Sequence, residues 1–402
     1  MNHNPIPLIY PRLDWQGQEI LPELWSVPVE REQESGQESG LLPEDAWFCI
    51  GSCFAERSAK ALKQHLLPVH FAAGASLYNP EAILRWLQLC RLAGTGSGSF
   101  ADFCSQTSVG GLVAEYPAVS GSPASYEGCG GYGKTRFLHP YAPGWLEADS
   151  REELLSQLWQ QCRFDYEFLS RSAVVLLTLG SSFSFYCPAQ ECYWSNGHRL
   201  PFAGPSAVLQ KKLLNPEQID EAFELMTELL GQINPGARVL YSVSPVRHDP
   251  LAAVDNSLSK AQLLSAVHRL RRQGRLCYFP AYEIVMDELR DYRWYDHRRK
   301  QLRIDSFALL LQRLLGAVAG PRLEQFLGRV SDLAGLLRHK ASRPSLWPFR
   351  QAGPQTRAGG AEVQAENLLA QLRRQYPQLE LPESIEAYRK LLEMYNPEIY
   401  SY

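Results

Sequence analysis

The sequence predicts an α/β protein built as three layers around a mostly parallel sheet. Three apolar runs rich in valine, leucine and aromatic residues are typical of strands buried on both faces; they lie at 173–180, 237–245 and 275–285. A stretch with helical periodicity precedes each run. Strands separated by helices of ten or more residues pair in parallel and carry helices on both faces of the sheet.

The first strand and helix of this sheet are expected near the start of the core. The run WFCI at 47–50 reads as a short strand, and Gly51 and Ser52 interrupt it as a tight turn. Apolar residues then recur at helical spacing as far as Leu66. A second helix is expected after Asn79-Pro80, because proline is favoured in the first turn of a helix.

The chain divides into three parts. Residues 1–45 are proline-rich and then acidic, which predicts an entry segment on the surface. Residues 46–345 form the α/β domain, interrupted by a glycine- and serine-rich insertion at about 91–135 and closed by an amphipathic helix at 304–318. Residues 346–402 comprise a linker and two polar helices, a small helical appendage for packing or for oligomerisation.

Composition excludes several classes of function. The net charge is −3 over 402 residues, so the chain as a whole offers no field to attract nucleic acid or anionic lipid. No signal peptide or membrane-spanning run is present, and a cytoplasmic location is expected. The nine cysteines never form a Cys-x-x-Cys pair, no ligand cluster suits a metal, and GTGSGS at 94–99 follows no strand. We therefore expect no cofactor, no metal, and neither a nucleic acid nor a membrane as partner.

The candidate chemistry follows the strands, because ligands of parallel α/β sheets gather at the carboxyl ends of the strands. Ser52 stands between a strand and a helix, where its hydroxyl can attack a substrate while amide groups at the helix N-terminus stabilise an oxyanion. Two other interpretations remain open. Ser52 can simply cap the helix, and Cys53 is a rival nucleophile.

The residues 51–55, Gly-Ser-Cys-Phe-Ala, resemble the signature of the GSCFA family, bacterial proteins similar to SGNH/GDSL serine hydrolases. Further blocks resemble the same family in the same order: LYNP, TLGSSFSFY, NGHRLP, VSPVRH, NSLSKAQL and YFPAYEIVMDELRDYRWY. The resemblance covers roughly residues 45–345. It implies a flavodoxin-like sheet, with Ser52 attacking an ester or acyl carbonyl.

The resemblance also implies where the oxyanion would be held. The wider superfamily uses the amide of the serine, here after Gly51, a glycine amide from a second block and an asparagine side chain from a third. Gly74 is the candidate for the second, although it can equally be a loop glycine with positive φ. Gly180 and Ser182 match the third block, where Ser182 replaces asparagine. That donor is then weaker, or it is supplied by Asn196 or His198.

The catalytic base is the main departure from the resemblance. The family has Asp-x-x-His-Pro near the end of the sheet, whereas this chain has Asp296 with an arginine three residues later. His297 can replace the missing histidine only if the loop is shifted, because adjacent side chains of an extended segment point in opposite directions. His248, beside Arg247 after a strand, is the other candidate, and it can also be a structural histidine. His139 and His198 lie in loops near the same edge.

Basic and aromatic residues crowd the loop around Asp296. They are Arg293, Arg298, Arg299, Lys300, Arg303, Tyr292, Trp294 and Tyr295. They can form a solvated charged surface with ordinary aromatic packing, or bind a phosphate or a uronate and stack on a sugar ring.

Two functions follow from these residues. The first is an SGNH-like serine hydrolase that removes an ester or acyl group from a small molecule, in particular from a carbohydrate. The second is a catalytically impaired member of the family that binds carbohydrate or acts as a scaffold. The position of an imidazole relative to the Ser52 hydroxyl discriminates between them.

Overall fold

The computed structural model describes residues 40–95, 99–106, 109–117, 135–143, 146–195, 209–247, 252–273, 276–290, 294–296, 301–337 and 358–394. Its centre is a five-stranded sheet in which every strand pair is parallel. In spatial order the strands are β10 (Cys277–Tyr278), β9 (Arg238–Val243), β5 (Val174–Leu179), β1 (Trp47–Gly51) and β2 (Val69–Phe71). The predicted α/β class with a parallel sheet is confirmed.

The order of the strands places a crevice beside β1. The chain runs from β1 to β2 at one edge, and the three later strands then add in sequence to the other side of β1. The direction of winding therefore reverses between β1 and β5. In open parallel sheets this switch point is where ligands bind, at the carboxyl ends of the strands.

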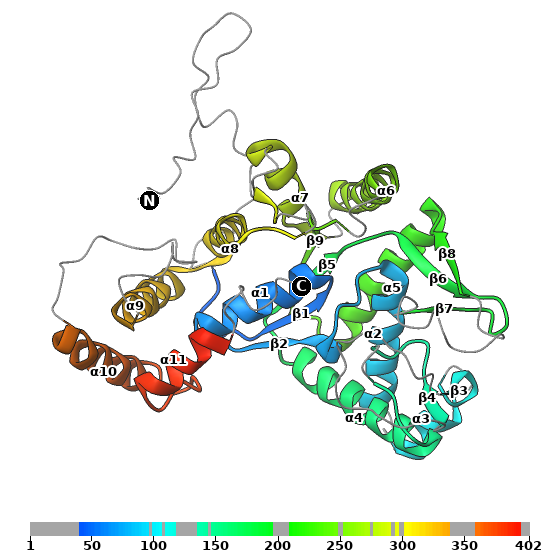
Figure 1. Ribbon diagram of the computed structural model, residues 1–402, viewed down its shortest axis with the longest axis horizontal. Helices are drawn as coiled ribbons and strands as arrows, with labels where there is room; N and C mark the ends of the chain where they lie inside the picture. Colours follow the sequence, from blue (N-terminus) through cyan, green and yellow to red (C-terminus); the bar gives the residue numbers. More distant parts are fainter. Residues whose placement is uncertain are drawn as a thin grey trace, which may run out of the picture.

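Helices cover both faces of the sheet, and side chains of β1 alternate between them. Phe48 and Ile50 belong to one core cluster, whereas Trp47 and Cys49 belong to the other. The first face carries α2 (Pro80–Gly94), α4 (Arg151–Leu169), α5 (Pro216–Ile233) and α6 (Ala253–Arg272). The second carries α1 (Cys53–Gln64), α8 (Ile304–Val318) and the helices that follow it. Figure 1 shows the two sets on opposite sides of β1 and β2.

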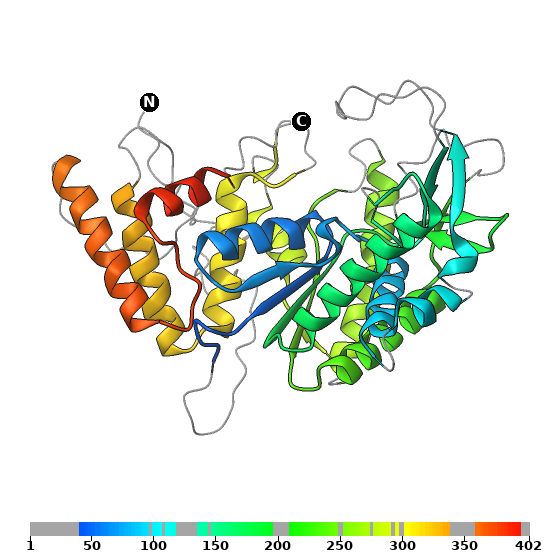
Figure 2. The same cartoon turned by 90° about the horizontal axis from the view of Figure 1, so that it is seen from below.

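The C-terminal helices continue the second layer. They are α9 (Pro321–Leu337), α10 (Ala358–Gln375) and α11 (Ile385–Met394). Figures 1 and 2 both show α11 between α9–α10 and the end of α1. Tyr388 of α11 is fully buried and donates its hydroxyl to the carbonyl of Gln64 at 3.0 Å. The Gln64 side chain in turn donates to the carbonyl of Leu392 at 3.2 Å. These helices therefore share the core of the α/β domain.

Smaller elements flank the sheet. Within the predicted insertion lie α3 (Phe100–Ser105), a 3-10 turn (Gly110–Leu112) and β3 (Ala114–Pro117), which pairs antiparallel with β4 (Thr135–Leu138). A second antiparallel sheet contains β7 (Cys192–Trp194), β6 (Phe183–Cys187) and β8 (Gln210–Leu213). The glycine- and serine-rich insertion at about 91–135 thus contains short helical and strand elements where it is described.

The predicted strand at 275–285 is mostly helical. Only β10 joins the sheet, and α7 (Ala281–Glu283) and a π-helical turn (Ile284–Leu289) follow it. β10 ends at Tyr278, two residues before Pro280, which has no N–H to donate to a neighbouring strand. Most of the predicted entry segment at 1–45 and of the linker after 345 lies outside the described residues.

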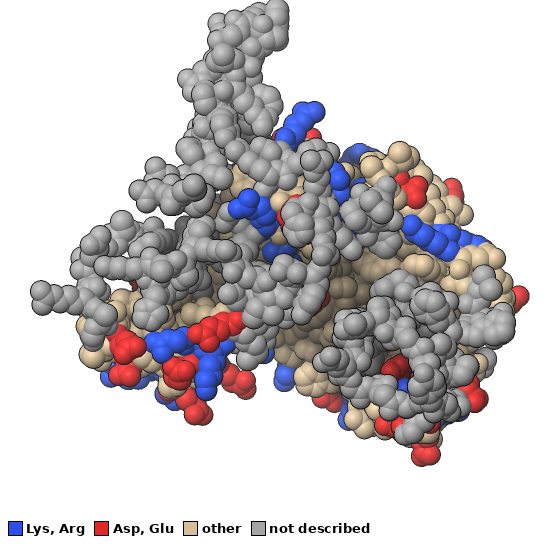
Figure 3. Space-filling model, viewed as in Figure 1, with Lys and Arg blue, Asp and Glu red and all other residues tan. Residues whose placement is uncertain are grey.

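Charge is distributed without a single dominant sign on the face shown in Figure 3, where Lys, Arg, Asp and Glu side chains are interspersed over the C-terminal helices. None of the helices in the described residues has the length and apolarity needed to cross a membrane.

Candidate active site

The turn from β1 into α1 requires glycine at position 51. Gly51 has a φ of 126°, and a Cβ atom at this position would lie 2.0 Å from the carbonyl oxygen of Thr178 on β5. This close approach allows the Ser52 N–H to donate to the same carbonyl at 2.9 Å. Gly51 therefore acts through its backbone: it lets the chain leave the sheet tightly enough to start a helix at Cys53.

Ser52 is the N-cap of α1, as the capping interpretation predicted. Its Oγ accepts the N–H of Phe54 at 3.3 Å and lies 2.8 Å from Oγ1 of Thr178. The residue is only 2% exposed, so the hydroxyl lies at the predicted strand-to-helix turn but is buried. Among the described residues the N–H of Cys53, the next amide of the helix N-terminus, has no hydrogen-bond partner. The α1 N-terminus therefore holds one uncommitted donor beside the Ser52 hydroxyl.

Gly180 lies directly against Ser52. A Cβ atom on Gly180 would lie 3.1 Å from Cβ of Ser52 and 3.0 Å from Cβ of Tyr78. The Gly180 N–H already donates to the carbonyl of Tyr78 at 2.7 Å. The Gly180 N–H is thus committed as a donor, and the missing side chain lets Ser52 and Tyr78 pack directly against the Gly180 backbone.

Ser182 is held inside the protein by α6. Its residue is fully buried, its hydroxyl donates to Oε1 of Gln262 at 2.8 Å, and its N–H donates to Oγ of Ser259 at 2.7 Å. These contacts fasten the end of β5 to α6. They do not resemble the free amide donor that the asparagine of the wider superfamily would provide.

Lys260 is a residue of this site that the sequence analysis did not identify. Its ammonium group donates to the carbonyl oxygen of Gly180 at 2.6 Å and also to that of Ser244, so it joins the carboxyl ends of β5 and β9. The residue is 4% exposed, and burial lowers the pKa of Lys260 to about 7. The sequence contained a signal, because Lys260 shares one face of α6 with Leu263 and Val267.

The loop that contains Asp296 packs on the first turn of α1. The side chain of Gln301 lies 3.8 to 3.9 Å from Sγ of Cys53, and the N–H of Asp296 donates to the carbonyl of Gln301 at 2.8 Å. Arg57, one turn into α1, donates to the carbonyl of Leu302 at 2.8 Å. Burial lowers the pKa of Arg57, and the nearby Cys53 and Asp296 oppose this shift. Burial also raises the pKa of Cys53, which favours the thiol over the nucleophilic thiolate.

The same loop reaches the segment after β9. Tyr295 donates its hydroxyl to the carbonyl of Pro245 at 3.0 Å, and the Arg247 guanidinium lies 5.6 Å from the centre of the Tyr295 ring. Trp294 and Tyr295 are 8% and 6% exposed, so these two aromatic rings pack inside the protein. Arg303 is exposed, whereas the other members of the basic and aromatic cluster, Tyr292, Arg293, Arg298, Arg299 and Lys300, lie outside the described residues.

Gly74 lies in a separate loop that a buried carboxylate fixes. Ala73 and Gly74 both have a φ of 58°, as the loop interpretation of Gly74 anticipated, and Gly74 is exposed. Asp165 of α4 is fully buried and accepts the N–H of Ala73 at 2.7 Å. The same carboxylate accepts Nε1 of Trp86 at 2.8 Å and lies 2.8 Å from Nε2 of His70. Asp165 thereby ties α4 to α2 and to the loop after β2.

The remaining predicted polar residues divide into two groups. His139 is buried, its Nδ1 accepts the N–H of Tyr141 at 3.2 Å and its Nε2 lies 3.1 Å from the carbonyl of Val109, which is a structural arrangement. The other group lies outside the described residues and comprises Asn196, His198, His248 and His297. Within the described residues, no group of three His, Cys, Asp or Glu side chains could hold a metal ion.

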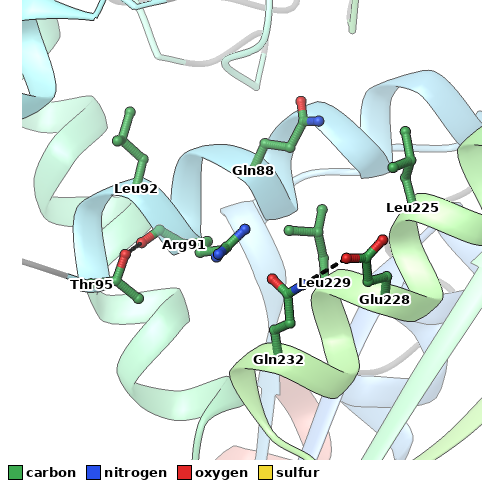
Figure 4. A pocket seen from close by; sticks show the side chains of 8 residues that line it. All are labelled: Gln88, Arg91, Leu92, Thr95, Leu225, Glu228, Leu229 and Gln232. Carbon is green, nitrogen blue, oxygen red and sulfur yellow. Dashed lines mark hydrogen bonds between the residues drawn. The ribbon is translucent and has the colours of Figure 1, made fainter.

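A groove of about 350 Å³ lies at the other end of the first helical layer. Figure 4 shows it between the last turns of α2 and α5, with Arg91 directed towards Glu228 and Gln232. Because α2 begins beside the strand ends at Pro80 and runs away from them, this groove is remote from Ser52.

The fold and the site together define a doubly wound α/β protein with a serine at the switch point, capping the helix that follows the first strand. The family model described as GSCFA family matches residues 46–308, and the chain belongs to this family. No curated protein and no solved structure matches the chain. The matched region contains every strand of the central sheet and stops inside α8, so α9, α10 and α11 lie beyond it.

Proposed function

We propose that this protein is an SGNH-like serine hydrolase in which Ser52 attacks an ester or acyl carbonyl. The observation that carries the proposal is the place of Ser52, at the N-terminus of α1 and at the carboxyl end of β1, where the winding of the sheet reverses. Counted along the chain, β1, β2, β5, β9 and β10 are the first to fifth strands of the sheet. Their spatial order is then 2-1-3-4-5, which is the order of flavodoxin-like sheets. It supports the flavodoxin-like fold that the family resemblance implies.

The proposed reaction has two steps. Oγ of Ser52 bonds to the acyl carbon while its proton passes to a base, and the alcohol leaves with a proton, giving an acyl-serine. Water then hydrolyses this ester and restores the hydroxyl. The uncommitted N–H of Cys53, at the positive end of the α1 dipole, can donate to the oxyanion in both steps. The base is His248 or His297, and the leaving group is the hydroxyl of a carbohydrate or a related metabolite.

A fluorophosphonate probe tests this proposal. The purified wild-type protein should become labelled at Ser52, as located by peptide mass spectrometry, and should hydrolyse short-chain nitrophenyl esters. Ser52→Ala should abolish both, whereas Ser58→Ala, which removes another buried hydroxyl of α1, should retain both. The variants His248→Ala and His297→Ala identify the base, because loss of the base lowers the rate by orders of magnitude whereas loss of the other histidine does not. A folded wild-type protein that is neither labelled nor active contradicts the proposal.

One observation favours the second candidate, a catalytically impaired protein that binds carbohydrate or acts as a scaffold. Ser52 is 2% exposed, and both hydrogen-bond partners of its hydroxyl belong to the protein itself. A substrate must therefore displace neighbouring groups to reach Oγ. This candidate predicts that Ser52→Ala leaves ligand binding unchanged, which calorimetry with acetylated oligosaccharides would measure.

A further inference from the structure

Thr178 is the polar residue of the strand next to Ser52. The run 173–179 reads AVVLLTL, and Thr178 is fully buried within it. A valine would fill the same volume without a hydroxyl, so packing alone does not account for threonine here. Its Oγ1 lies 2.8 Å from Oγ of Ser52.

The other hydrogen bonds of Oγ1 of Thr178 indicate which of these two oxygens donates to the other. Oγ1 of Thr178 accepts the N–H of Ser52 at 3.0 Å and the N–H of Ala55 at 3.2 Å. Each of these N–H groups is shared with a carbonyl oxygen, yet both point towards Oγ1. A hydroxyl has two acceptor sites and one proton, so the Thr178 proton is directed to the remaining neighbour, Oγ of Ser52.

The hydroxyl oxygen of Ser52 also has two donors around it. Its Oγ accepts the Thr178 hydroxyl and the N–H of Phe54, and these two donors occupy both acceptor sites. The proton of Ser52 is therefore not spent on Thr178. The Ser52 proton remains available to an acceptor outside these contacts. A serine nucleophile needs such an acceptor, because it loses its proton when it attacks.

We infer that Thr178 is a positioning residue, whose hydroxyl holds Oγ of Ser52 in place and leaves the Ser52 proton available for transfer to the base. The inference rests on the proposed function, since it assigns how the nucleophile is oriented. When Ser52 loses its proton, the Thr178 hydroxyl remains a donor to the developing negative charge on Oγ. When the acyl-serine is cleaved, Oγ is the leaving oxygen and the same donor stabilises it.

Two substitutions separate the hydroxyl from the packing. Thr178→Val keeps the shape and removes the hydroxyl, whereas Thr178→Ser keeps the hydroxyl and removes a methyl group. If the valine variant does not fold, Thr178→Ala takes its place in the comparison. Thr227→Val is the matched control, because Thr227 also bonds a hydroxyl, that of Tyr241 at 2.9 Å, and lies on α5.

The measurement is the rate of fluorophosphonate labelling and of nitrophenyl ester hydrolysis between about pH 6 and 9, with melting temperatures recorded in parallel. Thr178→Ser should retain the wild-type rate within about threefold. Thr178→Val or Thr178→Ala should lower the labelling rate and kcat by about 10- to 100-fold at unchanged KM, since one oriented donor to a charged oxygen is lost. The pH at which the rate rises should stay unchanged, because it reports the ionisation of the base and not that of Ser52.

Wild-type rates in the folded Thr178→Val or Thr178→Ala protein would overturn the inference while the proposed function stands. Equal losses in the serine and valine variants would also overturn it, since the packing and not the hydroxyl would then be responsible. A wild-type protein that is not labelled at all would instead contradict the proposed function, and the inference with it.

Discussion

The buried ammonium of Lys260 makes the stability of this protein depend on pH in a predictable direction. We consider Lys260→Met, which keeps an unbranched apolar side chain of similar length and removes the titratable group. In the folded protein burial lowers the pKa of Lys260 from 10.5 to about 7, and the nearby Cys53 thiol is the other titratable group that acts on it. In the unfolded chain the lysine regains its ordinary pKa.

These two pKa values set the sign and the size of the pH dependence of stability. Between pH 7 and 10.5 the unfolded chain binds a proton that the folded protein has lost, so the stability of the wild-type protein rises with pH across this range. Each pH unit contributes at most about 1.4 kcal/mol. From about pH 7 to about pH 9.5, the wild-type protein should gain roughly 3 kcal/mol relative to Lys260→Met. The loss of the donor to Gly180 and Ser244 also costs the variant stability, but that cost is independent of pH.

Urea denaturation of both proteins at several pH values measures this difference, in which the other titrating groups cancel. Lys63→Met is the matched control, because Lys63 is an exposed lysine on α1 and its loss changes the net charge equally. Parallel stability profiles for the wild-type and Lys260→Met proteins would refute the reasoning. They would mean that Lys260 keeps the same protonation state in the folded and unfolded chains across this range.

Substitutions at three further positions test one contact at the site and two contacts in the core. Gly180→Ala places a methyl group against Cβ of Ser52 and Cβ of Tyr78, so these residues must shift to accept it. The variant should slow fluorophosphonate labelling at least about tenfold while the protein remains folded; unchanged labelling would show that the close contact between Gly180 and Ser52 does not matter for the nucleophile. Asp165→Asn replaces an acceptor oxygen by an NH2 group that faces the buried donors Ala73 N–H and Trp86 Nε1–H. Urea denaturation should show a free energy of unfolding lower by about 2 to 4 kcal/mol. The control Glu167→Gln, at an exposed position of the same helix, should change it little. Tyr388→Phe removes the hydrogen bond to Gln64 and should lower the free energy of unfolding by about 1 kcal/mol. Tyr388→Ala also removes the buried ring and should lower it by about 3 to 5 kcal/mol. Equal stability of the two variants in calorimetry would show that the Tyr388 ring contributes nothing to the core.

The parallel sheet could be predicted from local sequence because its strands are buried on both faces. The runs at 47–50, 173–180 and 237–245 are continuous apolar segments, and each forms a strand of the central sheet. The short antiparallel strands β3, β4, β6, β7 and β8 gave no comparable signal, since they are three to five residues long and partly exposed. Their pairing depends on tertiary contacts that local periodicity does not contain.

The candidate site was predictable where the backbone imposes a requirement. The Gly51-Ser52 turn follows from a strand interrupted before a helix, and the structure has this turn with the capping contact. Thr178 and Lys260 were missed because their roles depend on residues distant in the sequence: Ser52 lies 126 positions from Thr178, and Gly180 lies 80 positions from Lys260. Thr178 nevertheless stands out as a polar residue in an otherwise apolar strand, and Lys260 as a charged residue on the helix face that buries Leu263 and Val267. A buried polar side chain of this kind needs a partner.

The contact between Tyr388 and Gln64 has a consequence for the synthesis of the protein. The two residues are 324 positions apart, so the far end of α1 cannot be covered until almost the whole described chain has left the ribosome. At about 5 to 20 residues per second, that interval is roughly 20 to 60 s. During this time the apolar surface of α1 that will receive α11 is accessible to chaperones and to other nascent chains.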